Sequence, residues 1–538
     1  MTENAQSTEP PACRGWLRRL FSWRTLRRVL YTIGTVAALV AILVGVEDWR
    51  GARAWRECRA ALEARGEVLD LNKFIPPPIR DDQNFAATPL LREIFTADAA
   101  NHAAMKAGRT NEIVTRISRI KPTYADYEHR PTSLGDVFQN HLADIESWAR
   151  HYRGNTNYPQ AVTTATPAEV VLAALGQFDP ELDELRAAAK SRPLSRFDVN
   201  YNTNIPVMTL VPHITAILTV SKVLMLHATA NLEVGKSDHA LADLKLMLRL
   251  ADSMGSDSMT ISHLVGVAAQ SLAAEIVQEG LVRHAWSDAQ LAEIEQAFAP
   301  LNILAGCKQA LRGERAYGVR MIDDLNRGSR KDWALGLCFF GIPQPVAWLA
   351  PRGWADYNKA NLCQWEDAYI VAALDENTRR VYPRTPDQAK EGRERWETMS
   401  VVEKIVHARR MIYAQMFYPG ASGMVRRSAQ VQTAIDEARI ACALERHRLA
   451  HGAYPDSLEA LAPTLIDKMP HDNINGEPLK YRREGDAGYV LYSVGWNEVD
   501  DGGKVVLDSY NPPRVDERKG DWVWRFPPTP DKQDSPQP

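Results

Sequence analysis

The sequence of 538 residues lacks the short motifs by which many enzymes are recognised. It contains no G-x-S-x-G nucleophile motif, no H-E-x-x-H zinc motif and no complete phosphate-binding loop. Gly235-Lys236-Ser237 imitates the end of such a loop, but Ala230 stands where the first glycine belongs, so a turn between helices is predicted there. These absences do not exclude an active site built from distant residues, because catalytic groups need not be neighbours in sequence.

The chain also lacks a strong excess of charge and any paired cysteine motif. Its 64 basic and 67 acidic residues give a net charge of -3, which offers nucleic acid no general attraction. No two cysteines stand in a C-x-x-C motif or at metal-ligand spacing. Free structural thiols are therefore predicted, and pairing among Cys307, Cys338 and Cys363 is the alternative. The six cysteines are Cys13, Cys58, Cys307, Cys338, Cys363 and Cys442.

One long uncharged run stands near the N-terminus, from Val29 to Val46 (VLYTIGTVAALVAILVGV), and it contains no proline. At a rise of 1.5 Å per residue it forms a helix roughly 27 Å long, close to the thickness of a bilayer's hydrocarbon core. A buried helix of a soluble protein fits poorly, because apolar residues occupy every face of the run. Residues 29–46 are therefore predicted to be a transmembrane helix in contact with lipid.

Arginines ahead of this run indicate its orientation by the positive-inside rule, which predicts a basic cytoplasmic tail over residues 1–28. Four arginines also follow the run, but Glu47 and Asp48 come first. No clear A-x-A cleavage site follows, so an uncleaved signal anchor is favoured over a signal peptide. The arginines before the run, and the tryptophans that suit an aromatic belt, are Arg14, Arg18, Arg19, Arg24, Arg27, Arg28, Trp16 and Trp23.

Residues 47–85 predict a juxtamembrane helix that stops near Gly66, followed by a spacer held extended by Pro76, Pro77 and Pro78. Helical patterns interrupted by polar breaks predict a helical body over residues 86–427, and the chain is too long for one core.

Within this body, the clearest helical patterns cover residues 210–233, 239–254, 261–283 and 288–298. The first two form a hairpin that resembles a tetratricopeptide-type pair, with Gly235 at the turn and Ala240 at the small position of the helix crossing. No fixed period recurs, so a repeat array is not predicted. The resemblance implies a surface that binds a protein partner.

A second uncharged stretch extends from Trp333 to Ala350 (WALGLCFFGIPQPVAWLA). Pro343 and Pro345 interrupt it, and backbone groups freed by proline are costly in lipid, so a second crossing is not expected. Two interpretations stay open. The stretch is either a loop buried against helices, or a hydrophobic loop that dips into a membrane or binds a partner. In the second case the exposed residues would be Phe339, Phe340, Trp348 and Leu349.

The pattern sharpens again from Ser428, where an apolar helical stripe runs until Gly452. Asp456 is expected to cap a short helix with Glu459, and residues 478–484, 488–495 and 521–526 read as strands. The sequence therefore predicts a small α+β module over residues 428–526, a long helix on an antiparallel sheet, and then a disordered tail over residues 527–538. The stripe consists of Val431, Ile435, Ala438, Cys442 and Leu449.

The string ALERHRLAHGAYPDSLEALAPTLIDKMPHDNINGEPLKYRREGDAGYVLYSVGWNEVDDGG resembles the C-terminal part of major, G-type pseudopilins of type II secretion. It is also similar to the tails of uncharacterised bacterial envelope proteins, as are LDLNKFIPPPIRDDQNFAATPL and PRGWADYNKANL. The chain departs from a pseudopilin because about 380 residues separate its apolar helix from the module, and no prepilin leader junction precedes Val29. The resemblance implies a bacterial inner-membrane protein with a large periplasmic domain.

Major pseudopilins bind calcium near this end, so the resemblance directs attention to the loop GWNEVDDGG. Asn497, Asp500 and Asp501 offer the oxygen ligands that calcium prefers, whereas the spacing is not that of an EF-hand. A calcium site and an ordinary acidic turn are the two interpretations. No other cofactor is indicated.

His447 and His451 lie four residues apart, so both imidazoles share one helix face. Zinc would need a further ligand, and none is evident nearby in the sequence. Histidines in the last turn of a helix also suit its negative end, so capping is favoured.

Two classes of function follow. The first is a non-catalytic scaffold or accessory factor in envelope assembly or secretion, anchored in the membrane. The alternative is a membrane-tethered periplasmic enzyme, such as a hydrolase, whose site is not visible as a motif. A deep pocket with convergent polar groups would favour the enzyme, and an apolar groove along the helices would favour the scaffold.

Overall fold

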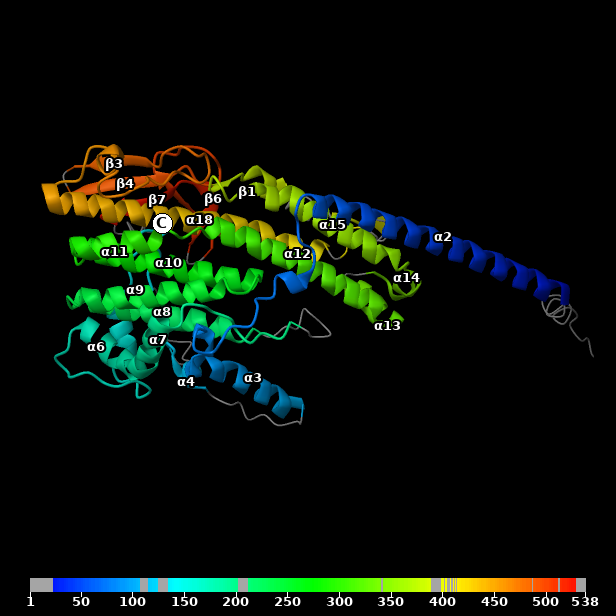
Figure 1. Ribbon diagram of the computed structural model, residues 1–538, viewed down its shortest axis with the longest axis horizontal. Helices are drawn as coiled ribbons and strands as arrows, with labels where there is room; N and C mark the ends of the chain where they lie inside the picture. Colours follow the sequence, from blue (N-terminus) through cyan, green and yellow to red (C-terminus); the bar gives the residue numbers. More distant parts are fainter. Residues whose placement is uncertain are drawn as a thin grey trace, which may run out of the picture.

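The computed structural model describes residues 23–106, 115–123, 134–201, 211–339, 342–388, 398–400, 402–403, 407, 410, 412, 414–485, 487–510 and 513–528. The protein is mainly helical, with small antiparallel sheets near its C-terminus, as predicted. Figure 1 shows an elongated body and one long helix that projects from its end.

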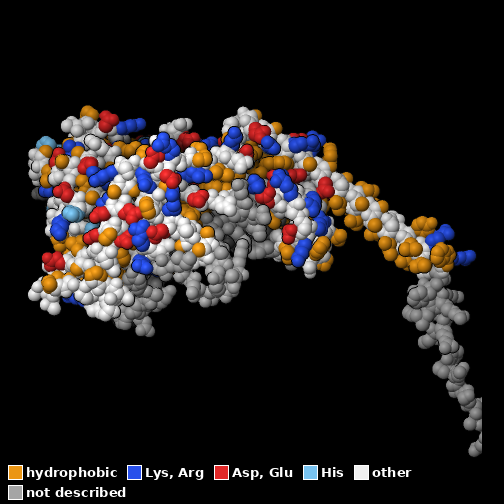
Figure 2. Space-filling model, turned by 60° about the horizontal axis from the view of Figure 1, so that its bottom comes forward, with side chains coloured by type: hydrophobic (Ala, Val, Ile, Leu, Met, Phe, Trp, Pro, Cys, Tyr) orange, Lys and Arg blue, Asp and Glu red, His pale blue; other side chains and the backbone are white. Residues whose placement is uncertain are grey.

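The projecting helix α2 (Trp23–Ala64) joins the predicted membrane segment and the predicted juxtamembrane helix in one continuous element. It ends just before Gly66, whose φ of +82° suits a glycine at a helix C-terminus. Side chains along residues 29–46 are almost all exposed, and Figure 2 shows hydrophobic side chains covering this part of the helix. The first half of α2 is therefore exposed and apolar, whereas the second half packs on the body.

Three described helices are long and apolar enough to cross a membrane, by length and composition alone. They are α2, α8 (His213–Glu233) and α10 (Thr260–Val282). In α8 and α10, 67% and 61% of the most apolar window is buried inside the protein, whereas none of the corresponding window of α2 is. The apolar residues of α8 and α10 thus form protein core, and those of α2 face outward.

The second half of α2 crosses α15 (Gly353–Tyr369) at a contact between two glycines. A Cβ atom at Gly51 would lie 2.2 Å from the carbonyl oxygen of Gly353, so only glycine allows this approach. The carboxylate of Asp48 accepts a hydrogen bond of 2.6 Å from the backbone N–H of Gly353, at the positive end of α15. The N-terminal end of α15 is therefore fixed to α2 just after the apolar stretch.

Beyond this crossing, α2 contributes to a small core shared with α15 and α12 (Ile303–Arg327). Cys58 and Leu62 are buried there against Val319 and Cys363. The ammonium group of Lys359 lies 4.8 Å from the ring centroid of Trp55. The last turns of α2 belong to the packed body.

The centre of the body consists of stacked helices. From the sheet downward, Figure 1 shows α18 (Ala414–His451), then α10 with α11 (Asp288–Phe298), then α9 (Ser237–Met254) with α8, and finally the smaller helices. The predicted helices at 210–233, 239–254, 261–283 and 288–298 are confirmed as α8 to α11 wherever they are described. Ala240 is fully buried, and Gly235 (φ +76°) turns the hairpin, so no phosphate loop forms there.

Smaller helices cover the lower face of this stack. Asn84 and Leu194 join two distant segments there by a parallel bridge, close to the start of the helical body. The smaller helices are α3 (Pro89–Lys106), α4 (Arg116–Arg119), α5 (Ile145–Tyr152), α6 (Pro167–Leu175) and α7 (Asp179–Ser191).

The second uncharged stretch forms two short helices, α13 (Arg330–Phe339) and α14 (Gln344–Leu349), rather than a loop. Trp333 and Ala347 are buried, which agrees with packing against helices. Leu335, Trp348 and Leu349 are exposed, which agrees with the other interpretation. Proline does not keep Trp348 and Leu349 out of a helix, because Pro345 stands in the first turn of α14, where its missing N–H costs nothing. Phe340 lies outside the described residues.

The C-terminal module places α18 against a sheet of order β3-β4-β7, formed by β3 (Lys480–Glu484), β4 (Gly488–Ser493) and β7 (Trp522–Phe526). These are the three predicted strands, all antiparallel. Two two-stranded sheets were not predicted. They consist of β1 (Leu374–Asp375) with β2 (Arg380–Val381), and β5 (Val505–Leu507) with β6 (Val515–Gly520).

Several details of the predicted module are wrong. The helix begins at Ala414, not near Ser428, and Leu449 is exposed although the rest of the stripe is buried. Asp456 caps no α-helix, because the short element is a 3-10 turn at Leu458–Ala460 whose N-cap residue is Ser457. Asp456 instead pairs with Arg483 at 2.8 Å. The helix does end at His451, just before Gly452, as predicted.

Candidate functional site

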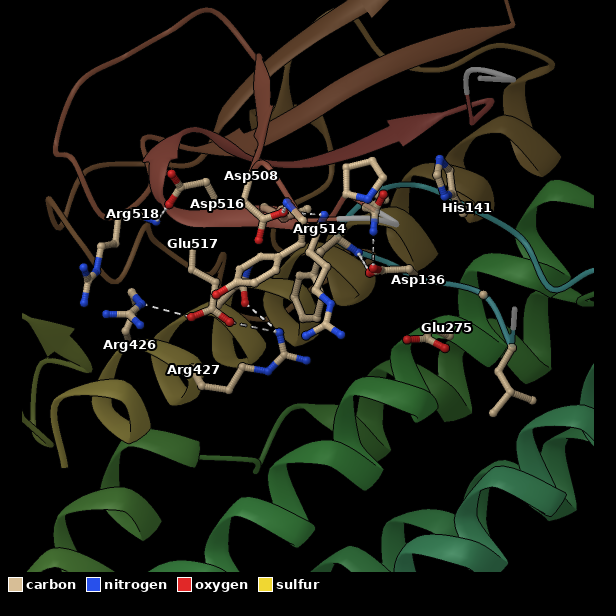
Figure 3. Close-up of a pocket in the computed structure, with 18 residues that line it drawn as sticks. Asp136, His141, Glu275, Arg426, Arg427, Asp508, Arg514, Asp516, Glu517 and Arg518 are labelled. Atoms are coloured by element: carbon tan, nitrogen blue, oxygen red, sulfur yellow. Dashed lines mark hydrogen bonds and ion pairs between the residues drawn. The ribbon is translucent and has the colours of Figure 1, made fainter. Parts of the chain in front are cut away.

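A cavity of about 1160 Å³ opens where the C-terminal module meets the helical stack. Its walls come from α10, α18, the residues around β6 and the segment 134–141 (Figure 3). These elements are far apart in sequence, so only the fold assembles the pocket.

Segment 134–141 is held in place through Asn140, which has a φ of 56°. Its side chain donates a hydrogen bond to the carbonyl of Val523 and accepts one from the N–H of Arg525, so it satisfies the free edge of β7. Gln278 of α10 donates to the same amide oxygen at 3.2 Å. The wall of the pocket is thus attached both to the sheet and to α10.

Two consecutive arginines of α18 meet one glutamate of β6. Arg426 Nε donates to Glu517 Oε2 at 2.9 Å, and Arg427 Nη1 lies 3.6 Å from Glu517 Oε1. Arg427 Nη1 also donates to Gln430 Oε1 at 2.8 Å. Two guanidinium groups therefore share the single carboxylate of Glu517, so this group of three side chains carries a net positive charge.

Aromatic rings position the two cations nearest the centre of the pocket. The guanidinium of Arg427 lies 4.5 Å from the ring centroid of Phe138, and that of Arg514 lies 5.9 Å from the ring centroid of Tyr510. Arg514 makes no side-chain ion pair with a described residue. Figure 3 shows these two guanidinium groups on one side of the pocket and the carboxyl groups of Glu275 and Asp136 on the other.

Glu275 is a buried carboxyl group on the side of the pocket formed by α10. Burial raises the pKa of Glu275 well above its usual range, nearby Asp136 and Glu279 raise it further, and Arg427 opposes them. One oxygen accepts a backbone hydrogen bond from Val137, and Oε2 has no partner among the described residues. Glu275 is therefore a buried carboxyl group whose pKa is raised, and its Oε2 has a free hydrogen-bonding position among the described residues.

Three donors that line the pocket also lack a partner within the described part of the chain. They are the buried nitrogen atoms Gln430 Nε2, Arg426 Nη1 and Arg518 Nε. A buried donor without an acceptor is costly, so an acceptor-rich ligand would relieve the cost. The arrangement can bind an anionic group such as a carboxylate or phosphate, and it can hold a proton at Glu275.

Replacing Glu275 with Gln tests the state of this carboxyl group. Because the folded-state pKa is raised, the contribution of Glu275 to stability is fully present below its unfolded value of about 4.5 and is lost as the pH rises through the folded value. We expect Glu275→Gln to gain stability relative to the wild type between pH 4 and pH 8, by on the order of 1–3 kcal/mol. Urea unfolding at several pH values measures the difference.

The half-exposed Glu293→Gln on α11 serves as the control for this comparison. A wild type and a Glu275→Gln variant whose stabilities run parallel over the same pH range would show that Glu275 is not protonated in the folded protein.

The predicted calcium-binding residues lie together in one loop, but their side chains form hydrogen bonds with other groups in and beside this loop. Asn497 Nδ2 donates to Asp501 Oδ2 at 3.0 Å, and Asp500 Oδ1 accepts from Gly502 N–H and from the hydroxyl of Tyr492. Buried Asp521, which the sequence did not single out, accepts backbone bonds from Asp501, Gly503 and Lys504. Within the described residues, no three His, Cys, Asp or Glu side chains form a metal-ligand group. Calorimetric titration of the protein with calcium tests whether the loop binds this ion.

The histidine pair bonds to backbone carbonyls near the end of α18, and His451 alone bonds to a carbonyl within the last turn, as expected of a capping residue. His447 Nδ1 lies 3.0 Å from the carbonyl oxygen of Ala453, and His451 Nδ1 lies 3.0 Å from that of His447. Each ring therefore pairs with a carbonyl at the helix end, and the two rings stack with centroids 4.2 Å apart. Cys58, Cys307, Cys338, Cys363 and Cys442 are free thiols, and Cys13 lies outside the described residues.

No match was found among protein-family models, curated proteins or solved structures. The sequence analysis missed the residues of the pocket because Glu275, Arg427 and Arg514 stand in three unrelated segments. The adjacent arginines Arg426 and Arg427 gave no distinctive signal, because the same helix carries another consecutive charged pair, Asp436 and Glu437.

Proposed function

We propose that this protein is held in a bacterial inner membrane by residues 29–46, with a short cytoplasmic tail and a large periplasmic domain. The observation that carries the proposal is the contrast within α2, whose first half is apolar and exposed while its second half packs on α15. Exposed apolar residues along eighteen positions would be unstable in water, and a bilayer removes that cost. Arginines in the preceding tail favour a cytoplasmic N-terminus.

The role that fits best is a non-catalytic scaffold or accessory factor in envelope assembly or secretion. The hairpin α8–α9, similar to a tetratricopeptide pair, and the helices α10 and α11 stacked with it supply a rigid surface for a protein partner. The C-terminal module, a long helix on a small antiparallel sheet, is consistent with the resemblance to major pseudopilins. The pocket beside it offers arginines to an acidic group of such a partner.

Protease accessibility of the full chain in cells tests this proposal. We expect the large domain to be digested once the outer membrane is permeabilised, while the inner membrane is still intact. Protection until the inner membrane is lysed would place the domain in the cytoplasm and contradict the proposed topology.

The pocket also favours a second candidate, a tethered hydrolase, because Glu275 and Asp136 form a pair of carboxyl groups across the pocket from two arginines, and burial raises the pKa of Glu275. Such a pair can supply a general acid and a base. The full-length protein would then cleave chromogenic esters, phosphates or glycosides, and Glu275→Gln would lower the rate by about 100-fold or more. If the wild type and Glu275→Gln both hydrolyse these substrates only at the background rate, the hydrolase is contradicted and the scaffold is favoured.

A further inference from the structure

Three large apolar side chains form an exposed patch at the end of the body from which α2 leaves. They are Leu335 of α13 and Trp348 and Leu349 of α14, and we call them the membrane-proximal patch. Their exposed fractions are 56%, 44% and 64%. Their helices are otherwise buried through Trp333, Leu337 and Ala347, so the three residues project from a well-packed base.

The position of the patch follows from the crossing of α2 and α15. Leu349 stands four residues before Gly353, whose N–H binds Asp48 of α2. Asp48 in turn comes two residues after Val46, the last residue of the apolar stretch. Figure 1 shows α13 and α14 at the end of the body toward which the free half of α2 extends. The patch therefore lies close to the level at which α2 would enter a bilayer.

Hydrogen bonds hold the patch in this position. Arg330 Nε donates to the carbonyl of Trp348 at 2.9 Å and so joins α13 to α14. Arg352 donates to the carbonyls of Asn326 and Gly328, which fixes the segment between α14 and α15 to the end of α12. A flexible loop could fold its apolar side chains inward, but this bonded pair of helices cannot do so easily.

The charges around the patch also suit a membrane surface. Burial and the neighbouring Arg352 lower the pKa of Arg330, while nearby Asp48 opposes them, which places the three groups together. Exposed Lys331 stands at the start of the same helix. Basic side chains bordering Trp and Leu are the composition found where proteins meet lipid headgroups.

We propose that the membrane-proximal patch inserts into the headgroup region of the same bilayer that α2 crosses. This inference rests on the proposed membrane anchor and adds a second contact to it. The occupant is lipid because the patch lies at the end of the body where the exposed apolar half of α2 begins, at the depth where tryptophan prefers to lie. Two contacts set apart fix the tilt and rotation of the body, which one helix alone cannot do. The pocket and the helical stack would then face the periplasm in a defined direction.

Spin labels in the full-length protein test this proposal in vesicles of phosphatidylethanolamine and phosphatidylglycerol. Cys13 and Cys338 are replaced by Ser, since the other cysteines are buried. Single cysteines then replace Leu349, Leu335, Val36 or Val499, one at a time. Val499 is the matched control, a 54% exposed aliphatic residue on the C-terminal module. Accessibility to oxygen, which dissolves in lipid, is compared with accessibility to a water-soluble nickel complex.

We expect the oxygen-to-nickel ratio at positions 349 and 335 to exceed that at 499 by roughly threefold or more, and to stay below that at 36. Equal ratios at 349, 335 and 499, with a high ratio at 36, would contradict insertion of the patch but would support the membrane anchor in α2. A low ratio at 36 would overturn the anchor itself. A label at 349 that neither reagent reaches would also overturn the proposal, because protein would then cover the patch.

Discussion

Placing arginine at both Val36 and Leu39 is expected to release the protein from the membrane. Both residues lie in the exposed apolar half of α2. One arginine at the centre of a spanning helix costs about 2.5–3.5 kcal/mol, so two cost roughly 5–7 kcal/mol, or about 10⁴-fold in partitioning. Carbonate extraction of membranes, followed by detection of the protein in the soluble fraction, measures the change.

The body of the variant should remain folded, because the first half of α2 has no packing partner in the described part of the chain. Contact with the body begins at Glu47 and Asp48, about two helical turns beyond the substituted residues. Loss from the membrane would then report on lipid contact and not on unfolding, and the thermal transition of the body should be unchanged.

A matched control places arginine at Val162 and Leu194, which are also exposed aliphatic residues but lie on the body. This double variant should stay in the membrane fraction. If the α2 variant resists carbonate extraction as the wild type does, residues 29–46 are not the anchor.

Patterns that repeat within one helix could be predicted from the sequence. Helices α8 to α11 follow from apolar residues at helical spacing and from breaks such as Gly235, and their positions agree closely with the structure. The strands β3, β4 and β7 follow in the same way from apolar residues between turn residues. In each case the signal lies within about twenty residues, so it does not depend on the rest of the fold.

The candidate site could not be predicted in this way, because its chemistry depends on burial. Nothing near Glu275 in the sequence indicates a raised pKa, since the apolar shell and the charge of Asp136 come from elements far away in the chain. For Asn497, Asp500 and Asp501 the sequence indicated a chemistry that the fold does not make evident. Their oxygen-bearing side chains suggested a metal site. Their hydrogen bonds within the loop show another use for the same side chains.

Replacing Glu67 with Gln should destabilise the body by about 3 kcal/mol or more. Glu67 follows α2 and accepts hydrogen bonds from Arg312, at 2.8 Å, and from the fully buried Arg315. The guanidinium of Arg315 already has two nitrogens without a hydrogen-bond partner among the described residues. Removing the carboxylate takes the closest acceptor away from a buried cation and leaves it with only Asp367, 3.9 Å from Nη1, and the nearby Glu366. Loss of a hydrogen-bonded partner from a buried ion pair is strongly destabilising.

The pH dependence of this effect has a defined sign. Burial raises the pKa of Glu67, but hydrogen bonds from Arg312 and Arg315 outweigh it and hold the pKa below the usual value of 4.5. The stabilisation is therefore present above the unfolded pKa and is lost as the pH falls through the folded one. The difference between wild type and Glu67→Gln in urea unfolding should be largest near neutral pH and should shrink below about pH 4.5.

Glu63→Gln is the matched control, because Glu63 pairs with Arg59 at 2.7 Å near the end of the same helix but is exposed to solvent. A surface pair of this kind contributes about 0–1 kcal/mol. The double variant Glu67→Gln with Arg315→Met should recover much of the loss, since it removes the buried charge along with its partner. Equal losses from Glu63→Gln and Glu67→Gln would contradict a buried ion pair. Recovery in the double variant would instead show that this buried ion pair joins the segment that follows α2 to α12.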